Sequence, residues 1–312
     1  MRVASKVMMY DGPTMNIPSN FIRTIIELNG AEGEAWLKRL PDLIAECERR
    51  WGLTVQPPFA LSYNYVAPAV RADGTEVVLK IGFPNPEIRR EMAALRSYAG
   101  EGMVQLLDVD EAQCAFVLER LRPGETLAAL PDDEQATAIA AQVMKQLWRP
   151  LPPNHSFQSV AEWAAGLRGL REMFGGGTGP LPKGLVERAE AHFAELLGST
   201  TNLVLLHGDL HHYNILSAER QPWLALDPKG MVGEPEYEVG PLLLNPFDLL
   251  ERPHPGRVLA RRIDQLAEML DFDRERLRAW GIAQAVLSAW WSIEDHGYGW
   301  EAAIACAELM AG

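Results

Sequence analysis

The amino-acid sequence predicts an α+β chain of two lobes, in which a small lobe built on an antiparallel sheet precedes a larger helical lobe. Alternating apolar runs dominate from about residue 55 to 121, whereas helical periodicity dominates from about 132 to 296. Pro123 and Gly124 stand between these regions and should break any element there. At 312 residues, the chain is long enough for each lobe to bury a core of its own.

These patterns divide the chain into three parts. We expect a helical extension at 1–54 that packs on the small lobe, the small lobe at 55–122, and the helical lobe at 123–312. Within the extension, residues 33–51 carry apolar side chains at helical spacing and predict an amphipathic helix. Pro41 should mark a kink or the start of a second helix, because proline lacks the N–H that a helix interior needs.

The small lobe is predicted to begin with a β-hairpin. Two apolar runs at 59–70 and 76–83 flank a short Asp-Gly segment, which is a typical hairpin turn. A helix should follow at 87–100, with Gly100 as its C-cap. The stretch 103–121 reads as two further strands around a polar turn, so the predicted order is strand, strand, helix, strand, strand.

The helical lobe is predicted from five long stretches with helical periodicity. These stretches are 132–149, 158–173, 182–198, 257–271 and 273–296. A different pattern interrupts them at 203–230, where two short apolar runs, Val204–Leu206 and Trp223–Leu226, flank a polar loop and predict short strands. The glycine-rich stretch 175–179 predicts only a flexible connection between helices, since no strand precedes it.

Composition restricts the class of partner. The hydrophobic content of 47% and the charged content of 23% are those of an ordinary globular protein. A formal net charge of −13 argues against a nucleic-acid or anionic-membrane partner, because a polyphosphate surface would repel the chain. The same charge is compatible with a cationic ligand, although acidity also serves solubility alone.

The cysteines and the apolar runs bear on the compartment. Cys47, Cys114 and Cys306 are odd in number, far apart and without a CxxC pair, which favours a reducing compartment and buried, unpaired thiols. The first residues lack a continuous apolar segment typical of a signal peptide. No run approaches the ~18 apolar residues that a membrane-spanning helix requires. We therefore expect a cytoplasmic protein with no membrane partner.

The segment LLHGDLHHYNIL, residues 205–216, holds most of the candidate chemistry and permits three interpretations. His207 and His211 are four residues apart and could bind zinc if the segment were helical, but Gly208 disfavours a helix and the glutamate of an H-E-x-x-H motif is absent. The segment could also be a polar loop without a function, in which the histidines hold the backbone. The third interpretation is the catalytic loop of a phosphotransferase.

Phosphoryl transfer needs few groups in a defined order. A carboxylate accepts the proton of the acceptor hydroxyl, and oxygen ligands hold Mg²⁺ against the phosphates. The sequence offers Asp209 as the base, Asn214 five residues later, and Asp227 after the next predicted strand. The histidines would then surround the site, while two carboxylates and one amide would carry the chemistry.

A phosphotransferase also needs a cation for the nucleotide phosphates, held by a carboxylate. Lys80 lies at the end of a predicted strand, and the next predicted helix offers Glu87 and Glu91. Glu91 is the better partner because it adjoins the apolar face of that helix. Glu87, near the helix start, could simply favour the helix dipole.

Taken together, Lys80, Glu91, HGDLHHYN at 207–214 and LALDPKG at 224–230 resemble the aminoglycoside phosphotransferase branch of the protein-kinase-like fold, which has H-G-D where protein kinases have H-R-D. Within this branch the chain is most similar to the streptomycin 6-phosphotransferase and hydroxyurea-resistance kinase group. The resemblance extends from about residue 17 to 296. It implies an ATP- and Mg²⁺-dependent transfer of the γ-phosphate to a hydroxyl of a small molecule, such as streptomycin.

The resemblance also implies roles for individual residues. Asp209 would be the base, Asn214 and Asp227 the Mg²⁺ ligands, and Lys80 the phosphate contact paired with Glu91. Residues 116–121 would form the hinge between the lobes. The remaining nucleotide contacts would be the backbone of Glu119 and Leu121 at adenine, and Ser62 at the phosphates. The loop around Ser62 departs from the protein-kinase pattern because it contains no glycine.

We expect a cationic acceptor, held by carboxylates in the helical lobe. The candidates lie in the acidic run 234–238 and at the end of the last predicted helix, where acidic side chains oppose the helix dipole. They are Glu234, Glu236, Glu294 and Asp295. An endogenous amino alcohol or sugar as acceptor, or a nucleotide-binding pseudokinase, remain alternatives, and the sequence leaves the oligomeric state and the choice of ATP or GTP open.

Overall fold

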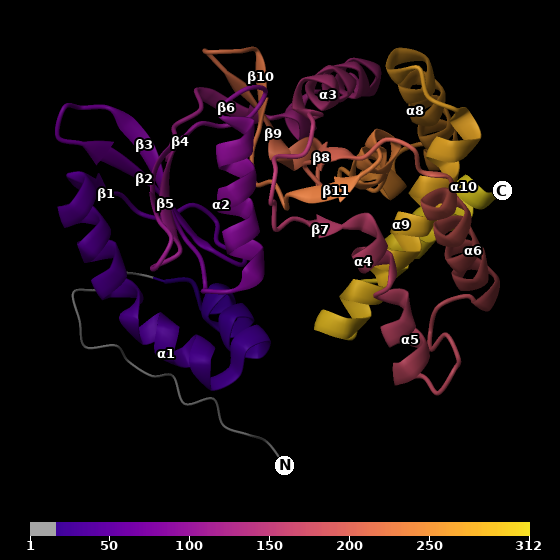
Figure 1. The fold of residues 1–312 in the computed structure, drawn as a ribbon, viewed down its shortest axis with the longest axis horizontal. Helices are drawn as coiled ribbons and strands as arrows, with labels where there is room; N and C mark the ends of the chain where they lie inside the picture. The colour runs from indigo at the N-terminus through magenta and orange to yellow at the C-terminus, as the bar shows by residue number, and fades with distance from the viewer. Residues whose placement is uncertain (1–16) are drawn as a thin grey trace. The chain divides into compact units, whose positions relative to one another are not determined.

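A computed structural model describes residues 17–312, which form two compact units. The smaller unit comprises residues up to Asn85 together with Asp108–Leu118, and the larger comprises Pro86–Leu107 together with Glu119–Gly312. The predicted α+β class is confirmed, since the smaller unit carries a sheet and the larger unit is mostly helical (Figure 1). The expectation that the chain begins without a signal peptide concerns residues 1–16, which lie outside the described part. The three-part division at 1–54, 55–122 and 123–312 stays a prediction.

The sheet of the smaller unit has five strands. In spatial order they are β1 (Leu53–Val55), β2 (Tyr65–Arg71), β3 (Glu76–Ile81), β5 (Ala115–Glu119) and β4 (Leu106–Asp110). The predicted hairpin is confirmed as the antiparallel pair of β2 and β3. Its turn is stabilised by Asp73, whose side chain accepts the Thr75 N–H at 2.9 Å, and by Gly74 at φ 87°. The first strand of this hairpin, β2, begins at Tyr65 and not at residue 59 as predicted.

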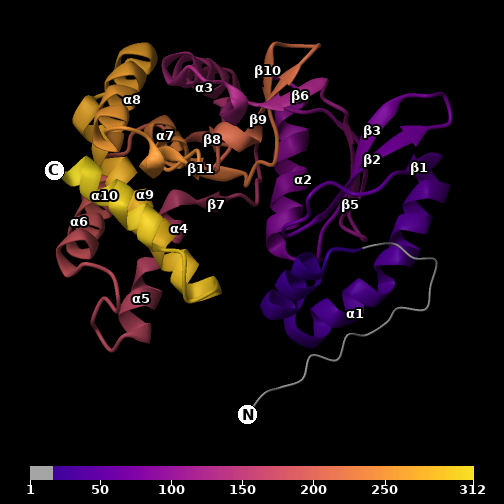
Figure 2. The same cartoon turned by 180° about the vertical axis from the view of Figure 1, so that it is seen from behind.

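Helix α1 (Ser19–Trp51) packs beside this sheet in the same unit (Figures 1 and 2). Its apolar face, including Phe21 and Leu40, joins the buried residues of β2 and β3 in one hydrophobic core. The prediction that a second helix could start at Pro41 was wrong. The chain departs from helical geometry at Gly30 (φ 55°, ψ −134°), because glycine reaches positive φ without a steric penalty, and the helix continues through Pro41.

The larger unit contains the remaining helices of the described chain. They are α2 (Pro86–Tyr98), α3 (Asp133–Leu147), α4 (Val160–Ala164), α5 (Leu167–Met173), α6 (Lys183–Ser199), α7 (Val239–Leu243), α8 (Pro255–Leu270), α9 (Arg274–Asp295) and α10 (Glu301–Ala311). α9 is buried on most of its surface and contacts α6, α7, α8 and α10. The single helix predicted at 158–173 is two short helices, divided around Gly166.

Two small sheets lie in the larger unit. One has the order β10 (Trp223–Ala225), β9 (Ile215–Ala218) and β6 (Pro123–Thr126), and the other β7 (Gln158–Ser159), β11 (Met231–Gly233) and β8 (Val204–Leu206). The expectation that Pro123 and Gly124 break any element was wrong, since they begin β6. β6 is an edge strand, where the missing proline N–H leaves no ladder bond unmade.

Within the larger unit, Arg149 connects helix α2 to the segment that follows α3. The Arg149 guanidinium donates to the carbonyl oxygens of Ser97 (3.1 Å) and Tyr98 (3.0 Å) and lies over the Tyr98 ring at 4.7 Å. This attachment matters for the site because α2 also carries Glu87 and Glu91.

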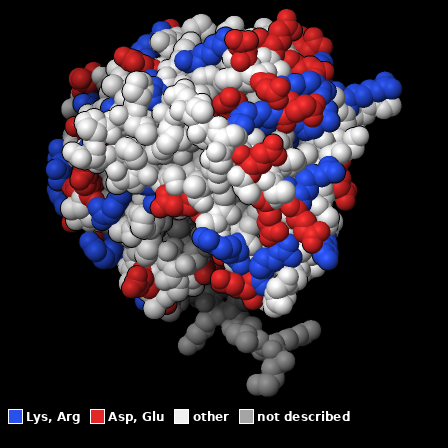
Figure 3. Space-filling view, turned by 45° about the vertical axis from the view of Figure 1, so that its right-hand side comes forward, with Lys and Arg blue, Asp and Glu red and all other residues white. Residues whose placement is uncertain are grey.

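Acidic and basic side chains are interspersed over the face shown in Figure 3. Cys47, Cys114 and Cys306 are buried free cysteines, as predicted. Within residues 17–312, no helix is long and apolar enough to cross a membrane.

Candidate active site

The segment 205–216 forms a loop between two strands of different sheets. β8 ends at Leu206, the chain then passes through His207, Gly208 and Asp209, and a short 3-10 turn at His212–Asn214 leads into β9. Gly208 has φ 86°, which a residue with a side chain rarely adopts. His207 and His211 therefore do not share a helical face, and the geometry required by the zinc interpretation is not formed.

His207 holds this loop in place from the inside. Its side chain is fully buried; its Nε2 lies 2.9 Å from the Leu226 carbonyl oxygen, and its Nδ1 accepts the Asp209 N–H at 3.2 Å. Burial lowers the pKa of His207 to about 4. A neutral ring that donates from Nε2 and accepts at Nδ1 satisfies both contacts, so His207 is a structural residue that fixes the position of Asp209.

Asp209 and Asn214 are brought together by the loop. The Asn214 Nδ2 donates to the Asp209 carbonyl oxygen at 2.9 Å, and the Asn214 side chain is only 8% exposed. The Asp209 carboxylate is 37% exposed and lies 3.8 Å from the His211 Nε2. Burial raises the pKa of Asp209, while His211 and Lys229 lower it. The loop thus presents a carboxylate at its surface and an amide fixed beneath it.

Asp227 follows on the next strand pair, as the sequence predicted. The Leu226 N–H donates to the Asn214 carbonyl oxygen at 3.0 Å, which ties the two segments together. Asp227 has φ 64°, a left-handed conformation that costs a non-glycine residue roughly 1 kcal/mol or more. Such strain persists where the surrounding structure requires it, often at functional sites. The negative charge of Asp227 raises the pKa of Asp209, so the two carboxylates act on each other.

Glu238, a buried residue of the acidic run that was expected to meet the acceptor, instead binds the backbone of the catalytic loop. Its two carboxylate oxygens accept the N–H groups of His207 (2.7 Å) and Gly208 (2.9 Å). The side chain is 0% exposed, and burial raises its pKa to about 7 although the backbone donors oppose this shift. Glu238 stands two residues from Glu236 in the same acidic run, so no local signal distinguishes it.

Lys229 and Glu87 form a second group that the sequence did not assign. The Lys229 ammonium makes a short ion pair with Glu87 Oε1. Burial would lower the pKa of Lys229, but Glu87, Asp209 and Asp227 together raise it above its usual range. Glu87 therefore has a definite partner in addition to its place in the first turn of α2.

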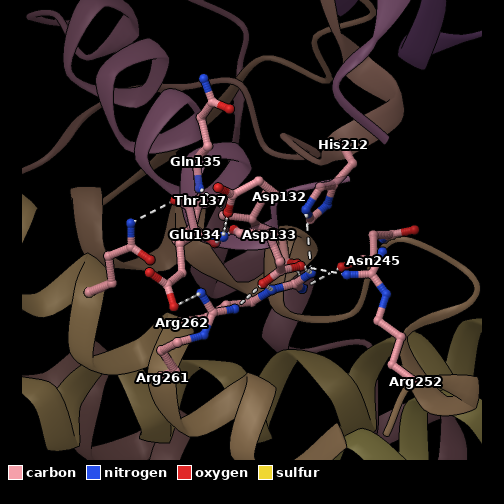
Figure 4. A network of polar contacts seen from close by, with 12 residues as sticks. Asp132, Asp133, Glu134, Gln135, Thr137, His212, Asn245, Arg252, Arg261 and Arg262 are labelled. Atoms are coloured by element: carbon pink, nitrogen blue, oxygen red, sulfur yellow. Dashed lines mark hydrogen bonds and ion pairs between the residues drawn. The ribbon is translucent and has the colours of Figure 1, made fainter. Parts of the chain in front are cut away.

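A network of charged side chains contacts the loop at His212 (Figure 4). Asp133, at the start of α3, accepts hydrogen bonds from the guanidinium groups of Arg252, Arg261 and Arg262. Arg262 is fully buried, donates to the Asn245 carbonyl oxygen at 2.5 Å, and lies 3.5 Å from His212 Nε2 in the catalytic loop. The network connects the loop to α3 and α8.

Asp209 is one of the residues that line a pocket of about 720 Å³ within the larger unit. Asp209, Lys229 and Glu87 line one part of it. Aromatic and polar side chains from α4, α9 and the segment after α7 line another part. These are Trp163, Trp291, Phe247, Asn245, Gln284, Glu162 and Asp295. The pocket is large enough for a small-molecule acceptor beside the candidate base.

The four predicted acceptor carboxylates fall in different places. Asp295 is exposed at the end of α9 and lines the pocket. Glu294 is exposed, and Glu236 is partly buried with a pKa that burial raises; neither belongs to the pocket lining. The expectation for Glu234 was wrong, since its buried carboxylate is occupied by an ion pair with Arg276 and a hydrogen bond from Trp280.

The predicted nucleotide residues are divided between the units. Ser62 and Lys80 lie in the smaller unit, where Ser62 is exposed and the buried Lys80 ammonium stands 5.8 Å from the Phe116 ring centroid. Glu91 is buried on α2 of the larger unit, which also contains Glu119 and Leu121. The Glu119 N–H already donates to the Gln105 carbonyl oxygen at 3.0 Å. A backbone bond from Glu119 to adenine would therefore use its carbonyl oxygen, as the acceptor.

Comparisons with known proteins agree with this geometry. Residues 50–296 match the family described as "Aminoglycoside/hydroxyurea antibiotic resistance kinase". The chain is 35% identical to a streptomycin 6-kinase of Streptomyces griseus, over 90% of this chain and 92% of that protein. It is also 35% identical to a hydroxyurea phosphotransferase of Kitasatospora aureofaciens, over 96% of this chain and 87% of that protein.

The fold comparison points the same way. A crystal structure of an aminoglycoside phosphotransferase in ternary complex with ADP and hygromycin B superposes with a TM-score of 0.58 and 16% identity, covering 86% of this chain and 98% of that one. At this identity the likeness shows the fold alone, which is the predicted protein-kinase-like fold.

Proposed function

Since the chain belongs to the aminoglycoside/hydroxyurea antibiotic resistance kinase family, we propose that it transfers the γ-phosphate of ATP to a hydroxyl group of a streptomycin-like aminoglycoside. One observation carries the proposal: the partly buried Asp209 lines a pocket of about 720 Å³, on a loop that also fixes Asn214 and adjoins Asp227. This is the set of groups that phosphoryl transfer to an alcohol requires.

The reaction asks Asp209 to orient the acceptor hydroxyl and to accept its proton as the oxygen attacks phosphorus. The His207 ring and the Glu238 carboxylate both bond the backbone of residues 207–209, so the position of Asp209 is set by buried groups rather than by solvent. A fixed geometry of this kind is the main contribution that a kinase makes, because the chemistry itself needs little covalent help from the protein.

The residues present fit a magnesium ion. The Asn214 NH₂ group is committed to the Asp209 carbonyl oxygen, which leaves the amide oxygen of Asn214 as its remaining polar atom for a cation. Asp227 adds a carboxylate in a strained backbone conformation. Mg²⁺ in kinases is held by one or two such oxygens and completed by substrate phosphates and water. When bound, the ion would neutralise charge on the phosphates.

We assign the other nucleotide contacts on the family likeness. Lys80 would contact the phosphates with Glu91 as its carboxylate partner, Ser62 would donate to a phosphate, and the backbone of Glu119 and Leu121 would bind adenine. The burial of Lys80 and Glu91, each 5% exposed, supports a role other than solvation, since charged side chains are rarely buried without a partner.

The acceptor is proposed to be cationic. Asp295 and Glu162 line the pocket, and Trp163 and Trp291 stand in an edge-to-face pair with ring centroids 4.7 Å apart on the same lining. Carboxylates and aromatic faces both attract amino and guanidino groups. A net charge of −13 would also favour the approach of a cation.

The direct test is to incubate the purified chain with ATP, Mg²⁺ and a panel of acceptors, and to detect phosphorylated product by mass spectrometry. We expect streptomycin to be phosphorylated, with Asp209→Ala as the inactive control. Phosphorylation of neutral sugars or amino alcohols alone would favour the metabolite kinase. Nucleotide binding without turnover on any acceptor would favour the pseudokinase.

A further inference from the structure

The ion pair of Lys229 and Glu87 lies at the reacting end of the pocket, and the assigned mechanism does not use it. We propose that Lys229 is a further catalytic residue, whose ammonium group contacts the transferring phosphoryl group while Glu87 positions it. This inference rests on the proposed function, because it assumes that a phosphoryl group passes between ATP and an acceptor at Asp209.

The backbone places Lys229 against the catalytic loop. The N–H groups of Lys229 and Gly230 both donate to the His207 carbonyl oxygen, at 2.8 and 3.2 Å. A Cβ atom added to Gly208 would stand 3.3 Å from the Lys229 Cβ. The stem of Lys229 therefore lies directly over the residue that precedes Asp209, and the two side chains line the same pocket.

The charges around the Lys229 ammonium suit a phosphate contact. It forms a close ion pair with Glu87 and interacts electrostatically with the carboxylates of Asp209 and Asp227. An ammonium group has three donors, so a bond to Glu87 leaves donors for a phosphoryl oxygen. The Lys229 side chain is 31% exposed, so a ligand in the pocket can reach it.

Glu87 is well placed to hold the Lys229 ammonium group in position. It stands in the first turn of α2, where the helix dipole already favours a carboxylate. α2 is itself fixed to the larger unit by Arg149, which donates to the Ser97 and Tyr98 carbonyl oxygens. Glu87, Lys229 and Asp209 therefore belong to one compact unit, and their spacing does not depend on the smaller one.

Lys229 would act during the transfer of the phosphoryl group itself. The acceptor oxygen forms a bond to the γ-phosphorus as the bond from that phosphorus to the β,γ-bridging oxygen breaks, and ADP leaves with the electron pair. The hydroxyl proton passes to the Asp209 carboxylate and then to water. Lys229 donates hydrogen bonds to one of the three non-bridging oxygens of the transferring group, over which the charge is spread in a loose transition state.

The test compares Lys229→Met with Lys229→Arg and with Lys183→Met. Lys183 is a matched control because its pair with Glu187 at 3.7 Å lies on the exposed surface of α6. We expect kcat of Lys229→Met to fall by about 10²–10³-fold, as for loss of one transition-state donor. Lys229→Arg should recover part of that loss, and Lys183→Met should match the wild type.

The affinities for ATP and ADP distinguish a contact between Lys229 and the γ-phosphate from a purely structural role of Lys229. Calorimetry should show that Lys229→Met weakens ATP several-fold and leaves ADP unchanged, because only ATP carries the γ-phosphate. Equal weakening of ATP and ADP, or a wild-type kcat, overturns the proposal. Glu87→Gln should lower kcat less than Lys229→Met, and Glu87→Asp should restore most of it; a Glu87→Gln enzyme as slow as Lys229→Met overturns the positioning role.

The two proposals can fail separately. If the wild-type chain phosphorylates no acceptor on the panel, the proposed function fails and the comparison of kcat values has no basis. If the wild type is active and Asp209→Ala is inactive, but Lys229→Met turns over normally, the proposed function stands and the role of Lys229 is wrong.

Discussion

Replacing Asp133 with asparagine should destabilise the chain far more than any exposed acidic substitution. The Asp133 carboxylate is only 15% exposed and accepts hydrogen bonds from three guanidinium groups, one of which, that of Arg262, is fully buried. Removing the negative charge leaves the Arg262 charge buried without its counterion. Loss of one partner of a buried ion pair typically costs about 3–5 kcal/mol.

The structure supplies a matched control for this prediction. Asp248 also pairs with Arg252, at 3.2 Å, but its side chain is 57% exposed and the pair spans one helical turn. An exposed pair of this kind contributes roughly 0–1 kcal/mol. Urea unfolding, followed by tryptophan fluorescence, should therefore give a midpoint for Asp133→Asn well below those of Asp248→Asn and the wild type, with similar slopes. Similar midpoints for the two variants would refute the reasoning.

The same network predicts how stability depends on pH. Although burial alone would raise the pKa of Asp133, the hydrogen bonds and charges of Arg262 and Arg261 lower it well below its usual range. A lowered pKa means that the native state binds fewer protons than the unfolded chain. The contribution of Asp133 is thus present above the unfolded pKa of about 3.9 and is lost as the pH falls toward the native value. The difference in the free energy of unfolding between the wild type and Asp133→Asn should therefore become smaller below about pH 4.

Four shorter predictions concern the site. Asp209→Ala should lower kcat by ~10²–10⁴-fold and leave ATP binding intact in calorimetry, because the base is not a nucleotide ligand. Asp227→Ala should lose the Mg²⁺ dependence of ATP affinity, whereas Lys80→Ala should weaken ATP more than adenosine; equal ATP affinity in wild type and both variants would count against the nucleotide site. Glu238→Gln sets an amide donor against the His207 and Gly208 N–H groups, so kcat should fall while KM for ATP holds. Asp295→Asn should raise KM for a cationic acceptor several-fold and leave KM for ATP unchanged, as steady-state kinetics can show.

Features that depend on local sequence were predicted well. The Asp-Gly turn between two alternating runs specifies the β2–β3 hairpin, because turn geometry and strand twist are set by neighbouring residues. One short loop and one strand pair separate Asp209, Asn214 and Asp227 in the structure, and their roles stay a prediction. The proposal that these three residues act together with Lys80 rests on the family likeness and is tested by the variants above.

Features that depend on distant partners were not predicted. The chain leaves helical geometry at Gly30 and not at Pro41, and the sequence does not show which of these two residues takes the non-helical conformation. Glu87 looked like a residue that merely favours a helix dipole, because its partner Lys229 is 142 residues away in the chain. Pro123 looked like a breaker because the sequence does not show that β6 would be an edge strand.

The acidic run 234–238 shows why composition alone could not locate the acceptor carboxylates. Its members are alike in type and spacing, yet Glu234 faces Arg276 and Trp280 on α9, whereas Glu238 faces the backbone of the catalytic loop. A 3-10 turn at Pro235–Glu238 follows Glu234 and rotates successive side chains by about a third of a turn, so Glu234 and Glu238, four residues apart, point to different surroundings. Burial then determines each role, since a buried carboxylate must find donors. Glu234 and Glu238 therefore support the scaffold of the site, and the proposed cationic acceptor would have to meet a carboxylate elsewhere, of which the exposed Asp295 lines the pocket.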